Sequence, residues 1–265
     1  MSDDESLVTA ASVFLGPGLW AYWLFRLWRL PLRKSGHVGR AVMTATLILC
    51  GLLIYSVLRT WASFDVVDAP PYVYMYVVLG LAWLRLLENS FAFLGLSVRD
   101  DVAERGNRSA ALALAGAFVG VTSCYAGGNI GDGPGWWVVV FSAALATGSW
   151  LAAWFALAAL TPVADAVAID RDPAAGLRLG AFLAASGLVM GRAVAGDWIS
   201  TGATVSDVVT ASPPVLLLLA LATFVEHRAR PTAERPHAPV VGFGLVPAAA
   251  YVALAIVAVA RLGRP

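Results

Sequence analysis

The sequence is poor in charge. Charged residues make up only 13% of its 265 residues, whereas a soluble domain usually carries about 25%. Apolar residues make up 59%, and the segment 136–160 contains no ionisable side chain. About 20 apolar residues cross the hydrocarbon core of a bilayer as a helix, so this composition excludes an ordinary soluble domain. In lipid the backbone must satisfy its own hydrogen bonds, and such segments are expected to be helical.

Cysteine and the usual motifs of catalysis are also scarce. The two cysteines, Cys50 and Cys124, fall within apolar segments and give no sign of a disulfide framework. No HExxH run or paired-cysteine spacing occurs, and the three histidines are scattered, so we predict neither a metal nor a cofactor. The run GNIGD is similar to the GxGD run of intramembrane aspartyl proteases without matching it. We therefore expect no enzymatic activity.

Eight apolar stretches alternate with hydrophilic connections. This pattern predicts an all-α, polytopic transmembrane bundle of about eight spans, with the whole chain, 1–265, as one integral membrane domain. The predicted spans are 7–28, 41–58, 71–97, 109–126, 136–160, 174–195, 208–225 and 242–260. They group into a flanking hairpin, a core and a second flanking hairpin, at 7–58, 71–195 and 208–260.

The charged residues concentrate on one side of the predicted bundle. Four connections hold most of them, near 29–40, 99–108, 161–173 and 226–237. The connections on the other side hold Arg59 and a set of aspartates. By the positive-inside bias, the four charged connections are cytoplasmic and both termini lie outside. A basic loop such as 26–40 would attract anionic lipid head groups, as basic loops generally do.

A short pattern occurs twice in the core. Residues 109–120 read SAALALAGAFVG and residues 173–184 read PAAGLRLGAFLA, and an offset of 64 residues aligns them. This offset contains two spans, so spans three–four and five–six would form a parallel internal repeat. Glycines four residues apart favour close helix packing, with a glycine-lined pore as the alternative. These glycines are Gly116, Gly120, Gly176, Gly180, Gly187 and Gly191.

Several polar residues fall within the predicted spans. Arg85, Glu88 and Asn89 are predicted to lie near the middle of the third span, where each charge costs about 2.5–3.5 kcal/mol. Their spacing lets Arg85 and Glu88 pair. They are therefore either a structural ion pair or part of a proton, ion or substrate pathway. Arg178, one turn into the sixth span, is expected to extend to the membrane surface.

Two connections on the outer side contain a Gly-Asp pair. The glycine-rich connection 127–137 holds Asn129 and Asp132, and the corresponding connection of the second copy holds Asp197, close to Arg192. Two aspartates related by a pseudo-twofold axis would form an acidic mouth that concentrates cations. The alternatives are a tight turn between helix ends and a local pairing of Arg192 with Asp197.

The segment 99–198 resembles the YjfL-type proteins, a family described as domain of unknown function 350. The resemblance rests on a GN-x-AAA-x4-G run after an acidic loop and on a weaker second copy. The matching residues are Gly106, Asn107, Ala110, Ala111 and Gly116, then Pro162, Ala174, Ala175, Gly176 and Gly187. Ser109 departs from the pattern, and members are commonly about half this length. The resemblance implies a bacterial inner-membrane protein and supplies no catalytic residues.

Two functions remain open from the sequence. The first is a permeation module for ions or small solutes, which would form a homo-oligomer. The second is a membrane scaffold or stress-response sensor, whose charged connections 99–108 and 226–237 would bind a cytoplasmic protein. The lipid bilayer is a partner in both, and nucleic acid in neither.

Overall fold

The computed structural model describes residues 1–29, 34–229 and 239–263, and it is 84% helical. The described residues contain eight helices long and apolar enough to cross a membrane, which confirms the predicted all-α membrane bundle. The eight spans are Asp3–Arg29, His37–Thr60, Pro70–Phe93, Arg108–Gly127, Trp136–Leu160, Pro173–Ala193, Thr201–Ala229 and Val241–Arg261. The fifth span has the predicted bounds.

Five spans are formed by single helices, and three contain a change of helix type or direction at a proline. The single helices are α3 (Lys34–Thr60), α5 (Pro70–Phe93), α6 (Arg108–Gly127), α7 (Trp136–Leu160) and α9 (Pro173–Ala193). The first span consists of α1 (Asp3–Val13), the π-helix η1 (Phe14–Gly18) and α2 (Leu19–Arg29). The seventh consists of α10 (Thr201–Ala211) and α11 (Pro213–Ala229), and the eighth of the π-helix η3 (Val240–Leu245) and α12 (Val246–Arg261). Three short segments lie between spans: α4 (Phe64–Val67), η2 (Val98–Glu104) and α8 (Val163–Ala168). Proline lacks the amide donor that an uninterrupted helix needs.

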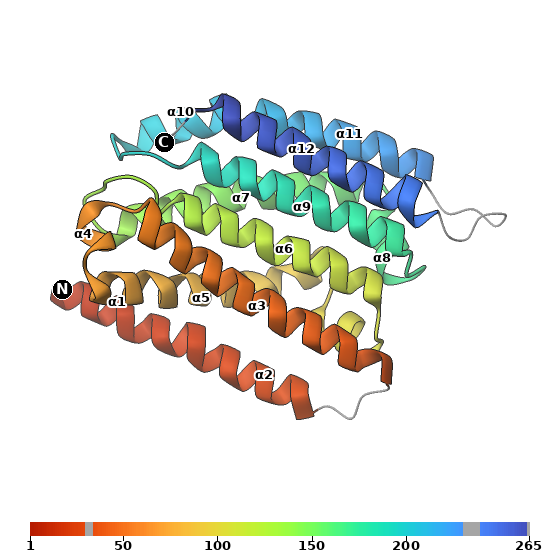
Figure 1. Cartoon of the computed structure of the whole chain (residues 1–265), viewed down its shortest axis with the longest axis horizontal. Helices are drawn as coiled ribbons and strands as arrows, with labels where there is room; N and C mark the ends of the chain where they lie inside the picture. The colour runs from red at the N-terminus through yellow and green to blue at the C-terminus, as the bar shows by residue number, and fades with distance from the viewer. Residues whose placement is uncertain (30–33, 230–238, 264–265) are drawn as a thin grey trace.

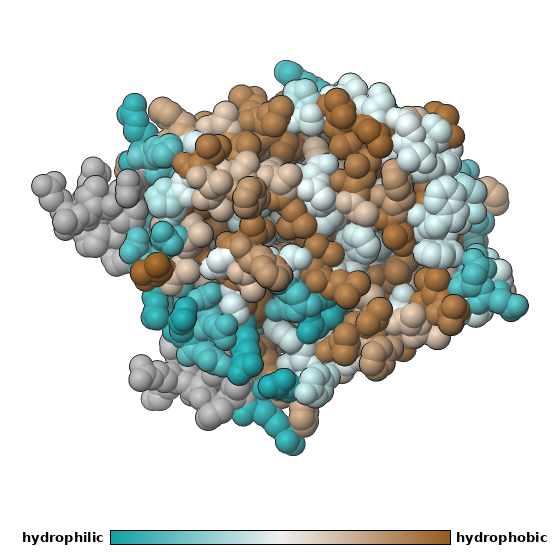
Figure 2. All heavy atoms as spheres, turned by 180° about the vertical axis from the view of Figure 1, so that it is seen from behind, coloured by the Kyte–Doolittle hydropathy of each residue, from teal (hydrophilic) through white to brown (hydrophobic). Residues whose placement is uncertain are grey.

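The spans lie side by side, and both chain termini lie at the same end of the bundle (Figure 1). We call this the acidic end; it carries α4, α10 and the connections 128–135 and 194–200. The opposite, charged-loop end carries η2 and α8. Between the two ends, apolar side chains cover most of the face seen in Figure 2. This apolar belt is the surface that faces lipid.

The centre of the bundle is a backbone-to-backbone contact between α6 and α9, the two most buried spans. A methyl group at Gly116 would lie 2.0 Å from the carbonyl oxygen of Gly180, and Gly127 has the same relation to Gly191. Residue numbers rise together along both helices, so α6 and α9 run parallel. The remaining glycines of the pattern pack in the same interface: Gly120 against Leu183, Gly187 against Gly120, and Gly176 against Ser109. The helices pack through the glycines that the sequence singled out, while the duplication itself stays a prediction.

A cluster of aromatic side chains holds neighbouring spans against this central pair. Trp20 and Phe91 both contact Phe118 of α6, with ring centroids 6.0 and 5.3 Å away. Phe91 also contacts Trp150 and Trp154 of α7, at 6.4 and 5.4 Å. Three of these four contacts are edge-to-face and Phe91–Trp154 is tilted; aromatic pairs contribute roughly 0.5–1.5 kcal/mol each beyond the area they bury. The cluster therefore joins α2, α5, α6 and α7.

The third span ends earlier than predicted, and this changes the depth of two charged residues. Helix α5 ends at Phe93, and Gly95 follows with a φ of 88°. A left-handed residue of this kind commonly terminates a helix. At about 1.5 Å per residue, Arg85 lies roughly 12 Å and Glu88 roughly 7.5 Å from the helix end. Arg85 is thus about one turn past the middle of α5, and Glu88 lies in its last two turns.

Replacing one glycine of the α6–α9 contact tests its importance. Gly116→Ala places a methyl group against the Gly180 backbone, and overpacking of this kind costs about 1–3 kcal/mol. Gly148→Ala on α7 is the control, because no atom lies within 4 Å of the added methyl group. Thermal unfolding in detergent should show a lower midpoint for Gly116→Ala and an unchanged or higher one for Gly148→Ala. Equal midpoints would show that the contact is not tight.

Candidate functional site

A cavity of about 270 Å³ lies at the acidic end. It is bounded by α4, the connection 128–135 and the connection 194–200. No arginine, lysine or histidine is among the described residues that line it. Five carboxylates do: Glu5, Asp65, Asp132, Asp197 and Asp207. We call this cavity the acidic vestibule.

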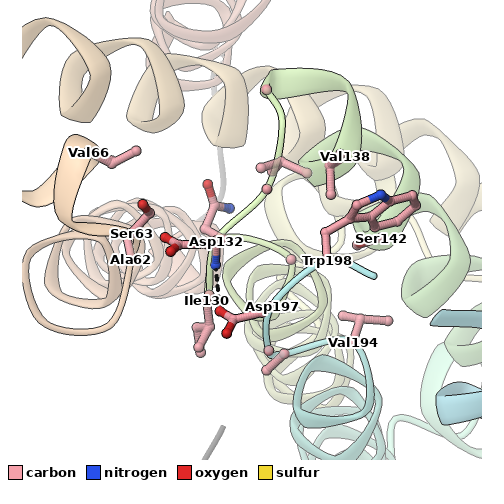
Figure 3. Close-up of a pocket in the computed structure, with 18 of the residues that line it drawn as sticks. Ala62, Ser63, Val66, Ile130, Asp132, Val138, Ser142, Val194, Asp197 and Trp198 are labelled. Atoms are coloured by element: carbon pink, nitrogen blue, oxygen red, sulfur yellow. Dashed lines mark hydrogen bonds between the residues drawn. The ribbon is translucent and has the colours of Figure 1, made fainter. Parts of the chain in front are cut away.

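Two of these aspartates are held side by side by hydrogen bonds between their connections (Figure 3). The Asp132 amide donates to Asp197 Oδ1 at 2.9 Å. The Trp198 amide donates to the Asp132 carbonyl at 2.7 Å, and the Gly196 amide to the Ile130 carbonyl at 2.9 Å. Trp198 also stacks edge-on against Trp137, with centroids 5.3 Å apart. The two connections therefore form one unit that fixes both aspartates.

The α3–α4 connection and α1 complete the wall of the vestibule. Ala62 forms a bridge with Gly131, which places Ser63 next to Asp132 (Figure 3). Gly131 has a φ of 97°, and a methyl group there would meet the Gly196 carbonyl carbon at 2.3 Å. Only glycine combines this dihedral angle with so close an approach. On the far side, Glu5 accepts a hydrogen bond from the Tyr72 hydroxyl at 3.1 Å.

The vestibule carboxylates are not neutralised by arginines. None of the four ion pairs among the described residues includes a vestibule carboxylate. Arg59, at the same end, donates to the Val67 carbonyl. Arg192 donates to the Ala195 carbonyl at 3.1 Å and to the Leu262 carbonyl at 3.0 Å. It therefore binds a backbone carbonyl at the C-terminal end of α12. The predicted pairing of Arg192 with Asp197 was wrong, and Arg192 does not line the vestibule.

Asn129 lies at the base of this cavity. It is buried, and its Nδ2 donates to the Tyr125 carbonyl in the last turns of α6 at 2.9 Å. Tyr76 and Ser142 also line the cavity and are buried as well. The structure therefore brings Asn129, Asp132 and Asp197 together in one cavity, with polar groups at its floor.

The other predicted group lies away from this cavity, toward the charged-loop end. Arg85 Nη1 contacts Glu88 Oε2 at 2.9 Å and Asn89 Oδ1 at 3.3 Å. The Arg85 guanidinium also lies 5.6 Å from the centre of the Trp20 ring. The three residues therefore pair among themselves, and none of them lines the vestibule.

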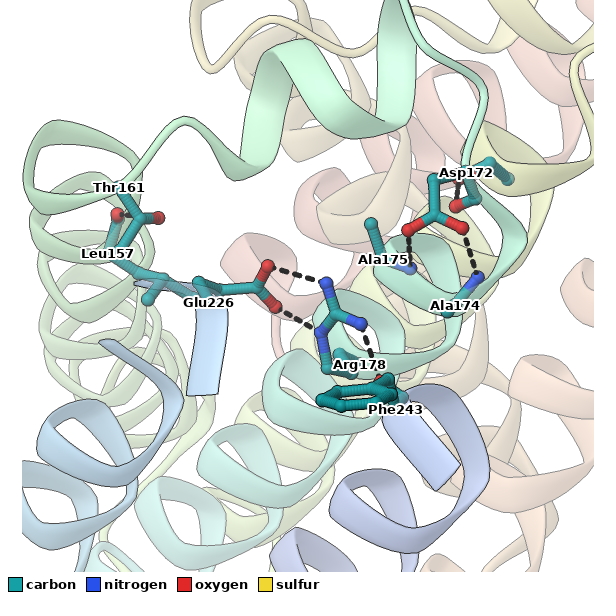
Figure 4. A network of polar contacts seen from close by, with 9 residues as sticks. Leu157, Thr161, Asp172, Ala174, Ala175, Arg178, Glu226 and Phe243 are labelled. Carbon is teal, nitrogen blue, oxygen red and sulfur yellow. Dashed lines mark hydrogen bonds and ion pairs between the residues drawn. The ribbon is translucent and has the colours of Figure 1, made fainter. Parts of the chain in front are cut away.

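Sequence reasoning missed the most deeply buried ion pair. Arg178 Nε and Nη2 donate to the two carboxylate oxygens of Glu226 at 2.6 and 2.7 Å, and Nη1 donates to the Phe243 carbonyl (Figure 4). The side chains are 1% and 5% exposed. The expectation that Arg178 extends to the membrane surface was therefore wrong. Arg178 lies in the second turn of α9 and Glu226 in the last turn of α11, so their shared end of the bundle was the only available sequence signal.

The predicted partner-binding loop 99–108 keeps five of its six charged residues exposed, and only Asp101 is buried. Asp101 is buried and accepts hydrogen bonds from the Ser97 amide and from Arg105 Nη1, both at 2.8 Å. Asn107 caps α6 and donates to the Val167 carbonyl at 2.8 Å, and the buried Asp172 caps α9. Most of the predicted loop 226–237, from 230 onward, lies outside the described residues. Asp101, Asn107 and Asp172 therefore hold helix ends together, while most of the charged side chains in the described part of these loops are exposed.

No protein family, curated protein or solved structure matches this chain. The resemblance of 99–198 to the YjfL-type proteins therefore stays a prediction. The function has to be inferred from the two ends of the bundle, where the described cavities and charged groups lie.

The buried ion pair can be tested by removing one partner or both. Arg178→Met leaves Glu226 buried without a counter-ion, and such a change costs about 3–5 kcal/mol. The double variant Arg178→Met/Glu226→Leu should recover most of this loss. Thermal and denaturant unfolding in detergent measure both effects.

The matched control is Arg99→Gln, which breaks an ion pair with Glu104 whose side chains are 57% and 43% exposed. An exposed pair of this kind contributes less than about 1 kcal/mol. Equal losses for Arg178→Met and Arg99→Gln would contradict a special role for the buried pair.

Proposed function

We propose that the protein admits small cations, inorganic or organic, and that the acidic vestibule is the entry site of a permeation pathway. The observation that carries this proposal is the set of five carboxylates around one cavity with no basic residue in its lining. The cavity, at about 270 Å³, is close to the lower limit of typical small-ligand pockets, about 300 Å³.

Electrostatics explains why such a cavity selects cations. Clefts lined by charges of one sign focus the field and raise local counter-ion concentration by roughly 10- to 1000-fold. The arginines nearest in sequence, Arg59 and Arg192, are engaged by backbone carbonyls, and no described basic residue forms an ion pair with these carboxylates. The carboxylates repel one another, and a cation that enters the cavity is stabilised because it reduces this repulsion.

A pathway from this entry would pass beside the central helix pair. The glycine contacts between α6 and α9 leave no room for a glycine-lined pore, since Gly116 and Gly180 touch. Polar groups instead continue from the vestibule floor between α5, α6 and α7. The Tyr125 hydroxyl donates to the Tyr76 carbonyl at 2.6 Å, and Trp83 Nε1 donates to Thr147 Oγ1 at 3.2 Å. These groups offer oxygen atoms within an otherwise apolar interior.

The scaffold function has weaker support. The exposed charges of 99–108 are of both signs, because three arginines stand beside Asp100 and Glu104, so they do not single out a partner of one charge. The permeation proposal instead rests on exposed carboxylates, Asp132 and Asp197 among them, around a cavity with no described basic lining residue.

This proposal includes an orientation, with the acidic end outside the cell. Single cysteines at Asp132 and Asp170 report on the two ends, because both positions are exposed and the native Cys50 and Cys124 are buried. In intact cells, a membrane-impermeant maleimide should label Asp132→Cys and leave Asp170→Cys unlabelled until the cells are lysed. The reverse pattern would contradict the proposed orientation.

The vestibule carboxylates should determine cation binding and flux. In Asp132→Asn/Asp197→Asn we expect cation affinity to fall by on the order of 30-fold, since each carboxylate about 4 Å from a monovalent cation contributes about 1 kcal/mol even in water and two are removed. Calorimetry with monovalent, divalent and organic cations measures binding, and flux assays in liposomes measure passage.

The matched control is Asp100→Asn/Asp170→Asn, which removes two exposed carboxylates from the opposite end. Affinity and flux should stay at the wild-type level in that variant. Cation binding without flux in well-folded protein would disprove the pathway, and equal losses in both variants would disprove the role of the vestibule.

A further inference from the structure

A second cavity, of about 190 Å³, lies between α2, α5 and η2 toward the charged-loop end. Three arginines from distant parts of the sequence line it, Arg26, Arg85 and Arg99, together with Tyr22 and Trp23. No carboxylate is among its described lining residues. We propose that this arginine groove binds the phosphate of an anionic membrane lipid.

Arg85 is positioned for this role by its surroundings. Its ion pair with Glu88 uses Nη1, and the guanidinium lies against the Trp20 ring. Its Nε is buried and has no hydrogen-bond partner among the described atoms. A buried donor without an acceptor is destabilising, so a nearby ligand oxygen would lower the free energy of the bound state. Planar guanidinium groups bind phosphate through paired hydrogen bonds.

The two other arginines are available to a ligand. Arg26 is exposed and forms no ion pair with a described carboxylate; its guanidinium lies 5.8 Å from the centre of the Tyr22 ring. Arg99 pairs with Glu104 at 3.1 Å, and both side chains are largely exposed. An exposed pair contributes little to stability, so a phosphate can replace the glutamate as partner of Arg99.

The surroundings of the groove favour a lipid as the source of the phosphate. Tyr22, Phe25 and Trp28 are each more than half exposed on the last turns of α2, and Phe93 is 91% exposed at the end of α5. Exposed aromatic residues near the ends of spans are typical of the membrane interface. A phosphate in the groove would therefore sit at head-group level, with its acyl chains along the apolar outer faces of α2 and α5.

This inference is independent of the cation pathway, because no residue of the arginine groove lines the vestibule. Purified protein in detergent should bind phosphatidylglycerol more tightly than phosphatidylcholine, as measured by native mass spectrometry or by titration of a fluorescent analogue. In Arg26→Gln/Arg99→Gln we expect the preference to fall by on the order of tenfold or more, since each arginine near an anionic surface contributes about fivefold. Unchanged thermal unfolding shows that this variant is folded.

Arg228→Gln is the matched control. Arg228 is also exposed in the last turn of an outer helix, α11, with its guanidinium 5.0 Å from the Phe224 ring. The phosphatidylglycerol preference should stay at the wild-type level in this variant. If Arg228→Gln lost the phosphatidylglycerol preference equally, the effect would come from general surface charge and the proposal would be wrong. An unchanged preference in Arg26→Gln/Arg99→Gln would also overturn it. Inorganic phosphate provides a third arm: if it binds as tightly as the lipid, the site takes a soluble anion and the lipid assignment is wrong.

Discussion

The contact between α6 and α9 is the constraint on which the rest of the structure depends. In lipid the hydrophobic effect does not drive helices together, so close van der Waals packing has to stabilise their association. Gly116, Gly180, Gly127 and Gly191 let the two backbones touch, and these helices become the most buried spans. The aromatic cluster around Phe118 then holds α2, α5 and α7 against α6.

A second constraint is that a charged side chain inside an apolar bundle needs a partner. Charged residues that have such partners in the protein are structural, and those that have none are candidates for binding a ligand. Arg178 and Glu226 satisfy each other between α9 and α11, and Asp172 caps α9. Arg40, buried at the start of α3, donates to the carbonyls that end α2. By contrast, no described basic side chain pairs with a carboxylate of the acidic vestibule, and Asp197 and Glu5 accept hydrogen bonds from uncharged donors. This missing counter-charge makes the vestibule the candidate for cation binding.

The two ends of the bundle therefore have complementary chemistry. Carboxylates surround one cavity at the acidic end, and arginines line the other toward the charged-loop end. In the proposed orientation, the vestibule attracts cations from outside, while the arginine groove faces the lipid head groups of the cytoplasmic leaflet. Arg85, about one turn past the middle of α5, lines this groove, and Glu88 is its ion-pair partner.

The sequence by itself determined the fold class and the eight spans. A span requires about 20 consecutive, mainly apolar residues, and this is a local property of the sequence. The sequence also singled out the glycines between α6 and α9, and it placed Asp132 and Asp197 on one side of the membrane. Only the tertiary structure decided which side chains meet. Helix rotation and the crossing of distant spans pair Arg178 with Glu226, direct Arg192 to the end of α12, and bring Arg26, Arg85 and Arg99 into one groove. These contacts join residues far apart in the chain, so no local pattern encodes them.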